Sequence, residues 1–337
     1  MSGRLPYFPH DSLFGTNLDA DCAADVCELA AFLDDGGSFL LSDLRNDIEI
    51  GQDEYEDVDA HNRMSSEPID AAVAVIESRQ KILGGAYPFE LDDAGSTLTY
   101  SGNLNWPRSA YLLSLVLSHL RALSPVLDTG NLQPSDAQVR ELRDWFQKIA
   151  APALAAELGG GLAWAFGHPR MDDLPFLRKL QEIWKEIDDG AVREEPPPGA
   201  PAQVKDDDID VIAARPQPDG EPGFPIALAQ VATGKGWASK SVRNHVQNVF
   251  FECWFVDRPA SQVWSYHIIP FIIKAEVMRR QTLSLGHILH RLRLVRLLAN
   301  AEQDVEGERI RSEGTEAFDH LILWLEAYRN DEAQDAT

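Results

Sequence analysis

The first half of the chain carries apolar residues at helical spacing. Amphipathic stretches cover residues 19–33 and 67–83, and residues 134–156 repeat the same spacing. Residues 107–123 are apolar almost all round, which is typical of a buried helix. The pattern predicts a helical N-terminal domain over residues 1–158.

The pattern changes in the second half. Residues 172–187 carry an apolar stripe that predicts another helix. Two short apolar runs, 209–214 and 225–231, stand on either side of a segment rich in Gly and Pro, which predicts a β-hairpin. A helix over residues 237–254 and a buried strand over 264–274 are expected to follow.

The expected order is helix, strand, strand, helix, strand, with room for a further strand near residues 191–194. It predicts a small mixed sheet flanked by helices. The fold class is therefore α/β (α+β), with a helical N-terminal domain and a mixed-sheet domain over 159–337. The pattern over residues 283–299 predicts a short strand followed by a basic helix. Residues 302–330 are expected to form a long helix, which packs either on the N-terminal domain or on a second copy of the chain in a homodimer.

Composition narrows the class of protein. The 337 residues are 44% hydrophobic, yet no run of eighteen apolar residues occurs, so we expect no membrane segment. The N-terminus lacks the basic and apolar regions of a signal peptide. Cys22, Cys27 and Cys253 form neither a zinc pattern nor a disulfide framework. These features predict a cytoplasmic protein.

Charge argues against a protein that coats nucleic acid, because the formal net charge is −24. An acidic run, "DLRNDIEIGQDEYEDVD", covers residues 43–59 and predicts either a solvated loop or a surface through which the N-terminal domain docks a protein partner. Basic residues gather between 235 and 296. Among them, Arg291, Arg293 and Arg296 on the basic helix could contact phosphate or balance the acidic half.

Candidate chemistry lies on the predicted hairpin and just after it. Asp210 stands in "DIDVIAA" on the first strand, and Gln230 in "AQVATGKGWASK" on the second. These stretches resemble the "GLDVVAW…GQCATG…W…K" pattern of bacterial proteins in the PD-(D/E)XK superfamily, the restriction-endonuclease-like nucleases. The resemblance covers the C-terminal half only. It implies an αβββαβ core, bound Mg²⁺ or Mn²⁺, and hydrolysis of phosphodiester bonds in DNA, with RNA as an alternative substrate.

The family's site residues can be carried over position by position. Asp210 matches the strand aspartate, and Gln230 matches the acidic member of the (D/E)xK triplet. Ala232 stands where the family has lysine, so Lys240, and after it Lys235, is expected to take that catalytic role. The implied metal ligands are Asp210, Gln230 and the Val231 carbonyl.

A first-helix carboxylate is the fourth implied ligand, supplied by Glu182 or Glu186 on the helix expected over 172–187. Asp208 is either a solvated residue or a partner of Asp210 on the same strand face. His267 and the pair His287 and His290 are expected to be packed structural residues.

The resemblance implies a Mg²⁺-dependent DNA endonuclease, in a bacterial antiviral defence setting. The alternative is a catalytically decayed nuclease-fold protein that serves as a binding or scaffold subunit of a defence complex, which Gln230 and Ala232 favour because an amide adds no charge and the lysine is displaced. A third hypothesis is an effector that stays inactive until a partner binds the N-terminal domain.

Overall fold

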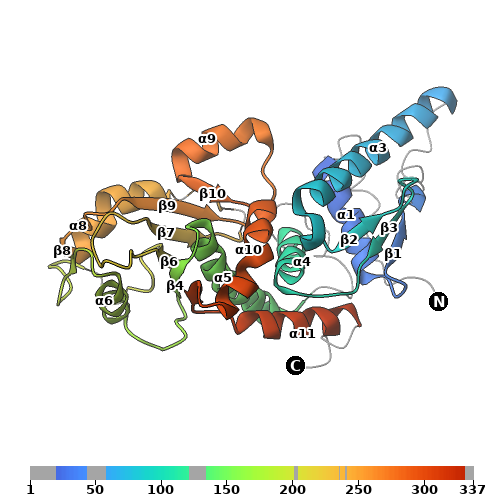
Figure 1. The fold of residues 1–337 in the computed structure, drawn as a ribbon. Helices are drawn as coiled ribbons and strands as arrows, with labels where there is room; N and C mark the ends of the chain where they lie inside the picture. The colour runs from blue at the N-terminus through green and yellow to red at the C-terminus, as the bar shows by residue number, and fades with distance from the viewer. Residues whose placement is uncertain are drawn as a thin grey trace. The chain divides into compact units, whose positions relative to one another are not determined.

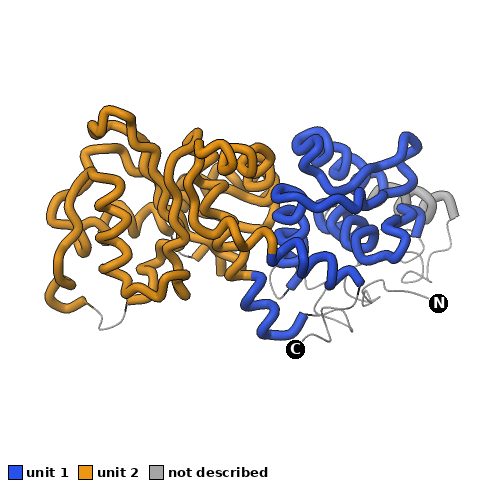
Figure 2. The backbone as a smooth tube through the Cα atoms, turned by 60° about the horizontal axis from the view of Figure 1, so that its bottom comes forward, with its two compact units in different colours: residues 1–142, 320–337 blue, residues 143–319 orange. Residues whose placement is uncertain are grey.

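The computed structural model describes residues 20–43, 58–120, 134–200, 204–234, 236–239 and 241–330, with the side chains of residues 58–68 left out. The chain forms two compact units (Figure 2). Unit 1 comprises Met1–Leu142 and His320–Thr337, and unit 2 comprises Arg143–Asp319. The division falls inside a helix, whereas the sequence pattern placed a single boundary after residue 158.

Unit 1 contains the helices that periodicity predicts over residues 19–33, 67–83 and 107–123, and a small sheet that it does not predict; the helix predicted over 134–156 lies mostly in unit 2. The sheet is antiparallel, with strand order β1-β3-β2. Its strands are too short for alternation to be recognised in the sequence. The elements are α1 (Ala20–Leu33), β1 (Ser38–Leu40), α3 (Val58–Leu83), the 3₁₀ turn η1 (Gly84–Ala86), β2 (Phe89–Leu91), β3 (Thr97–Tyr100) and α4 (Trp106–Ser118).

Unit 2 is built on a mixed six-stranded sheet with strand order β10-β9-β7-β6-β4-β11 (Figure 1). The β4, β6 and β7 strands pair antiparallel, and β9 joins β7 in parallel. The outer strands β10 and β11 are also parallel to their neighbours. The strands are β4 (Gly161–Ala165), β6 (Val211–Ala214), β7 (Ile226–Val231), β9 (Val263–Ile268), β10 (His287–Leu289) and β11 (Ile310–Ser312).

One face of this sheet carries an aromatic-rich core. Ile212, Leu228 and Phe166 pack there with side chains of two helical segments. The segments are α6 (Phe176–Ile187) and a continuous run made of α7 (Val242–His245), a π-helical turn (Val246–Phe250) and α8 (Phe251–Trp254). Ser241 fixes the start of the run, because its side chain accepts the Asn244 N–H.

The remaining elements precede, connect or follow the strands of this sheet in the chain. The helix α5 precedes β4, and α9 and α10 flank β10 in the chain. These elements are α5 (Asp136–Glu157), α9 (Ala275–Leu285), α10 (Arg291–Glu306), α11 (Ala317–Arg329), and the pair β5 (Ala191–Val192) and β8 (Phe255–Asp257), which form a separate two-stranded sheet.

Three sequence expectations for unit 2 need correction. The helix before the first central strand is α5, whereas α6 is inserted between β4 and β6. The strand near residues 191–194 is β5, which pairs with β8 outside the main sheet. Residues 302–330 do not form one helix, because α10 ends at a Gly307 cap and β11 intervenes before α11.

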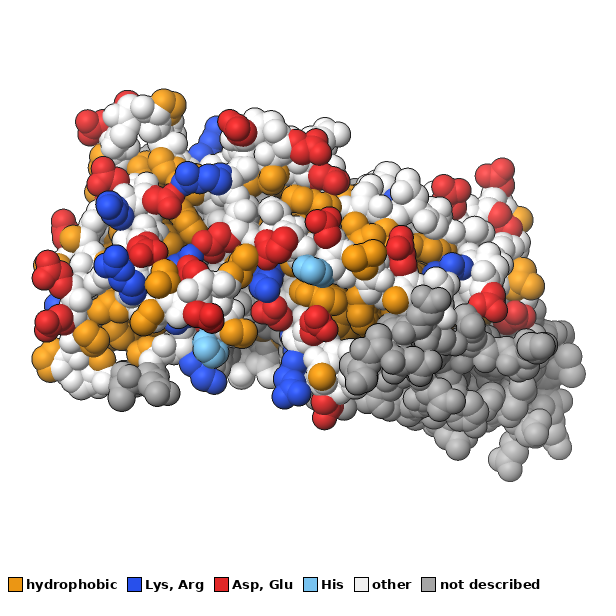
Figure 3. Space-filling model, turned by 90° about the horizontal axis from the view of Figure 1, so that it is seen from below, with side chains coloured by type: hydrophobic (Ala, Val, Ile, Leu, Met, Phe, Trp, Pro, Cys, Tyr) orange, Lys and Arg blue, Asp and Glu red, His pale blue; other side chains and the backbone are white. Residues whose placement is uncertain are grey.

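The surface charge is mixed. On the face drawn in Figure 3, Lys and Arg side chains are interspersed with Asp and Glu, and the described residues there form no broad basic surface. Within the described ranges, no helix has the length and apolar character needed to cross a membrane. The acidic run at 43–59 lies almost wholly outside the described residues.

Candidate functional site

Asp210 lies immediately before β6, where the ends of three central strands meet. Its N–H donates to the Ala229 carbonyl at 2.8 Å, and its Oδ2 accepts the Val231 N–H at 2.8 Å. Its carbonyl oxygen accepts the N–H groups of Phe166 and Gly167, each at 2.8 Å. The backbone bonds therefore fix the carboxylate at the C-terminal end of β7, beside the end of β4.

Gly167 and Gln147 form a further wall of this site. A Cβ added at Gly167 would lie 2.7 Å from Asp210 Oδ1 and would overlap the Gln147 amide. Because real Cβ atoms do not approach heavy atoms this closely, any larger residue here would displace the Gln147 amide or the Asp210 carboxylate. Gln147 on α5 and the Asp210 carboxylate thus both border Gly167.

Gln230 stands near the end of β7 and is 7% exposed. Its Nε2 donates to Asp208 Oδ1 at 3.4 Å, which joins Asp208 to the site. Its Oε1 is buried and has no hydrogen-bond partner among the described residues. Buried acceptors are normally satisfied, so this oxygen marks a place that a ligand, a water or a cation can occupy.

His267 is the residue paired with Gln230 across the parallel β7 and β9 strands. It is fully buried, and neither ring nitrogen has a hydrogen-bond partner of ordinary geometry in the described ranges. Burial lowers the pKa of His267 to about 4, and the nearby Trp237 backbone offsets this only in part. The imidazole is therefore neutral at neutral pH.

The turn before Asp210 is anchored to the helical run that follows β7. Asp207 and Asp208 adopt left-handed backbone conformations with φ of 51° and 61°. Asp207 Oδ2 accepts the Trp254 Nε1–H at 2.7 Å and lies 3.1 Å from His245 Nε2. Strained turns of this kind persist where surrounding bonds hold them, which is common at functional sites.

The electrostatics of this anchor favour an ion pair. Burial opposes ionisation of Asp207, but the hydrogen bonds from His245 and Trp254 hold the pKa of its carboxyl below the usual range. The hydrogen bond to Asp207 raises the pKa of His245 against the opposing effect of burial. The anchor therefore stabilises the turn that presents Asp208 and Asp210.

A pocket of about 460 Å³ opens beside this turn. Trp254, Phe176 and Pro175 contribute apolar walls, and Arg170 and Lys205 contribute polar groups. Arg170 is itself tied to backbone carbonyls, donating to Leu174 at 2.8 Å and to Lys205. Because Trp254 also binds Asp207, the pocket adjoins the acidic turn.

The structure brings together only some of the residues that the resemblance implied. Asp210, Gln230 and Val231 lie together at the strand ends. Glu182 does not join them: it is on α6, where its side chain is 47% exposed and pairs with Arg178 at 3.3 Å.

Other implied residues lie elsewhere. Glu186 is also on α6 and pairs with Arg311. Lys235 and Lys240 fall outside the described residues. Arg291, expected on a surface, is fully buried, and its Nε donates to the Pro270 carbonyl at 3.2 Å. It is therefore not available to phosphate.

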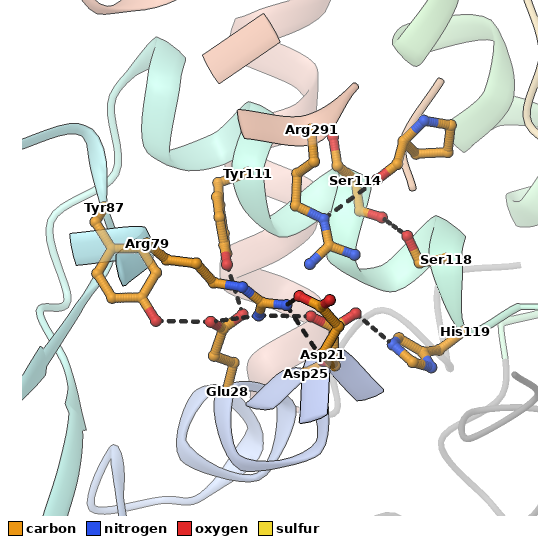
Figure 4. Close-up of polar contacts among 11 residues, drawn as sticks. Asp21, Asp25, Glu28, Arg79, Tyr87, Tyr111, Ser114, Ser118, His119 and Arg291 are labelled. Carbon is orange, nitrogen blue, oxygen red and sulfur yellow. Dashed lines mark hydrogen bonds and ion pairs between the residues drawn. The ribbon is translucent and has the colours of Figure 1, made fainter. Parts of the chain in front are cut away.

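A second buried polar cluster lies in unit 1 around Arg79 on α3 (Figure 4). The Arg79 side chain donates from Nη1 to Asp25 Oδ1 at 2.7 Å and to Glu28 Oε1 at 2.8 Å, and from Nη2 to Asp21 Oδ1 at 3.2 Å. All three carboxylates are on α1. The cluster therefore ties α1 to α3 through ion pairs.

Other side chains of unit 1 complete the cluster. Tyr87 and Tyr111 donate their hydroxyls to Glu28 at 2.6 and 2.7 Å, and His119 Nε2 lies 2.8 Å from Asp25 Oδ2. Both Glu28 oxygens are thus bonded within the protein. The cluster has the character of a structural core rather than a ligand site.

In the described part of the chain, no group of three or more His, Cys, Asp and Glu side chains is placed to hold a metal ion. A cation at the strand ends would therefore need at least one ligand of another type, such as the Gln230 amide beside Asp210. Comparisons of the chain with protein-family models, with curated proteins and with solved structures found no match.

Sequence reasoning missed Gln147, Gly167 and the anchoring pair of Asp207 and His245. The signal for Gln147 was hidden because its helix was assigned to the other domain. The glycine gave no signal by itself, since its role depends on two side chains distant in sequence. His267 was noticed but interpreted as packing alone.

Proposed function

We propose that unit 2 is a divalent-cation-dependent phosphodiester hydrolase that acts on DNA, with its centre at Asp210 and Gln230. The observation that carries the proposal is the unpartnered Gln230 Oε1, buried at the strand ends where the Asp210 carboxylate is fixed. The element order adds support, because α5, β4, β6, β7, the α7–α8 run and β9 follow the αβββαβ order that the resemblance implies.

The residues present fit Mg²⁺ or Mn²⁺ in part. Both ions prefer oxygen ligands, and Asp210, Gln230 and the backbone of Val231 offer them at one place. Only one of these groups carries a charge, so weak binding is expected. When bound, the cation would polarise the scissile phosphate and lower the pKa of an attacking water.

The protein's own groups would orient the reaction. The Val231 N–H holds Asp210 Oδ2, so the carboxylate keeps one direction, with Oδ1 on the Gly167 side. Asp208 orients the Gln230 amide through Nε2, which turns Oε1 inward. The proposed lysine is Lys240, or Lys235 after it, and would stabilise charge on the phosphoryl oxygens.

The neighbouring pocket suits part of a nucleic acid. Its lining is partly apolar, and a base of single-stranded or distorted DNA could pack against it. Such local contacts would compensate for the net charge of −24, which disfavours broad contacts with a duplex backbone. RNA satisfies the same chemistry and belongs in the test. Bacterial antiviral defence is proposed as the setting on the resemblance alone.

The test is cleavage of plasmid DNA, single-stranded DNA and RNA with Mg²⁺ or Mn²⁺. Asp210→Asn should abolish cleavage, whereas Asp219→Asn, a matched change in the exposed hairpin turn, should retain it. Lys240→Ala and Lys235→Ala in the same assay assign the lysine. Wild-type protein that cuts none of these substrates, or Asp210→Asn protein that cuts normally, would exclude this centre.

The second candidate is a nuclease-fold protein that binds nucleic acid or a protein partner without cutting. The observation that favours it is the lack of a three-residue metal-binding group in the described ranges. It predicts cation-independent binding to DNA, or capture of a defence partner by unit 1 or by a homodimer, without hydrolysis. Mobility-shift titration alongside the cleavage assay separates the two candidates.

A further inference from the structure

The pairing of β7 with β9 sets two unsatisfied polar side chains next to each other. Gln230 and His267 are Cα partners in the parallel ladder. Paired residues on neighbouring strands project from the same face, and the strands lie about 4.8 Å apart. The amide and the imidazole therefore stand side by side inside the fold.

Each of these side chains has polar atoms without a hydrogen-bond partner among the described residues. In Gln230 the atom is Oε1, and in His267 neither ring nitrogen has a partner of ordinary geometry, although the Trp237 backbone lies near the ring. One bond between them would leave the second ring nitrogen unsatisfied. Two adjacent orphan groups on rigid strands are unusual, since nearly all buried polar atoms in proteins are paired. They mark a place where a ligand can bind.

The donor types identify the class of that ligand. An amide oxygen and a neutral imidazole nitrogen both offer lone pairs, and neither brings a charge that would repel the other. Imidazole suits Fe²⁺, Ni²⁺, Cu²⁺ and Zn²⁺ best and is also accepted by Mn²⁺, whereas Mg²⁺ favours all-oxygen shells. The alternative is a structural water molecule that bridges the two groups, which would give the pair no role in binding a cation.

We propose that His267 is a nitrogen ligand beside Gln230 Oε1, and that the resident cation of the site is Mn²⁺ or a later first-row divalent ion rather than Mg²⁺. This inference rests on the cation site of the proposed function, but it does not require that the site hydrolyse phosphodiester bonds. Asp210, fixed next to the end of β7, supplies the carboxylate on the other side of Gln230.

The surroundings of His267 suit such a ligand. The Trp237 ring lies 6.1 Å from the imidazole, and the Phe271 ring lies 6.4 Å from Trp237. The Trp237 ring is therefore a direct neighbour of the histidine, which is fully buried. A protected imidazole remains unprotonated and in place, and both conditions are needed for metal binding.

Pulsed electron paramagnetic resonance of Mn²⁺ bound to the full chain tests the proposal directly. Wild-type protein should show ¹⁴N modulation from a coordinated imidazole. His267→Leu should lose that modulation and bind Mn²⁺ about tenfold more weakly or worse. His290→Leu removes a partly buried histidine of unit 2 and should leave both properties unchanged.

Labelling wild-type protein with ¹⁵N-histidine identifies a histidine ligand even if His267→Leu fails to fold, because the ¹⁴N pattern should then disappear. Wild-type protein without ¹⁴N modulation, or a variant His267→Leu that retains it, overturns the proposal. So does equal loss in His290→Leu. Cleavage supported by Mg²⁺ and unaffected by His267→Leu would overturn this inference while leaving the proposed function intact. Histidine-bound Mn²⁺ in a protein that cuts no substrate would support this inference and contradict the proposed function.

Discussion

The two buried polar clusters of this protein differ in whether their groups find partners. In unit 1, the carboxylates around Arg79 are bonded to a guanidinium, two phenols and an imidazole (Figure 4). The Nε of Arg79 is the exception. In unit 2, the neighbours Gln230 and His267 keep unpartnered atoms although both are buried.

The difference shows that burial of polar groups does not by itself identify a ligand site. A buried charge is tolerated when opposite charges and donors surround it, and then it contributes to the fold. Burial alone would lower the pKa of Arg79, but Glu28, Tyr111 and Asp25 raise it well above the usual range. Polar atoms without such compensation are the better indicator of a site, because a ligand can supply what the protein does not.

Replacement of Arg79 should have the largest effect on stability. Arg79→Met leaves Asp25 and Glu28 buried without their cation, so the free energy of unfolding should fall by about 3–5 kcal/mol. Lys81→Met changes an exposed lysine of the same helix and should cost less than about 0.5 kcal/mol. Chemical denaturation followed by circular dichroism measures both. Equal, small effects would mean that the cluster is not structural.

A methyl group at Gly167 should damage the site without unfolding the protein. Gly167→Ala places a Cβ against Asp210 Oδ1 and the Gln147 amide, and a displacement of about 1 Å can cost a hundredfold in rate. Gly234→Ala is the matched control, because nothing lies within 4 Å of its added Cβ. Cleavage rates report the effect. If both variants cut like wild type, Asp210 is not part of a catalytic centre.

Removal of the orphan imidazole should act in the opposite direction to the Arg79 change. Without added metal, His267→Leu replaces unpartnered buried nitrogens by apolar surface, and the free energy of unfolding should rise by about 1–2 kcal/mol. Thermal unfolding in a chelating buffer measures this gain. A marked loss of stability would show that His267 has structural partners, and the contrast between the two clusters would disappear.

The smallest effect concerns the Asp207 and His245 anchor. The pKa of His245 is raised above 6.5 in the folded state, so its contribution to stability is complete below pH 6.5 and is lost as pH rises through the raised value. The lowered pKa of Asp207 adds stability that is present above pH 3.8 and is lost as pH falls through the lowered value.

The stability difference between wild type and His245→Gln should therefore be largest between these two limits and shrink at higher pH. We expect it to stay below about 1 kcal/mol, since both side chains are partly exposed. Denaturation midpoints from pH 4 to 9 would show the trend. A difference that grows with pH would contradict the ion pair.

The sequence predicted the centre of unit 2 better than its surroundings. The hairpin that presents Asp210 and Gln230 was recognisable because two apolar runs stand on either side of a turn rich in Gly and Pro, and β6 and β7 start within two residues of the predicted positions. A hairpin also fixes which strands are neighbours. The two site residues on adjacent strands followed from that.

The remainder depended on long-range packing. Helical periodicity shows which side of α5 is buried but not which core it joins, so Gln147 was missed, and the first-helix carboxylate was expected on α6, as Glu182 or Glu186. Parallel strands share no turn, so the register that sets His267 beside Gln230 was not visible in the sequence. The strand β11 has three residues, too few for a recognisable pattern.

The most direct test is a crystal of the full chain soaked in Mn²⁺ and examined by anomalous scattering. The account predicts one strong anomalous peak at the ends of β6, β7 and β9, within coordination distance of Gln230 Oε1 and a His267 ring nitrogen. Absence of a peak there at millimolar Mn²⁺, or a water bridging the two side chains while the metal binds elsewhere, would contradict it.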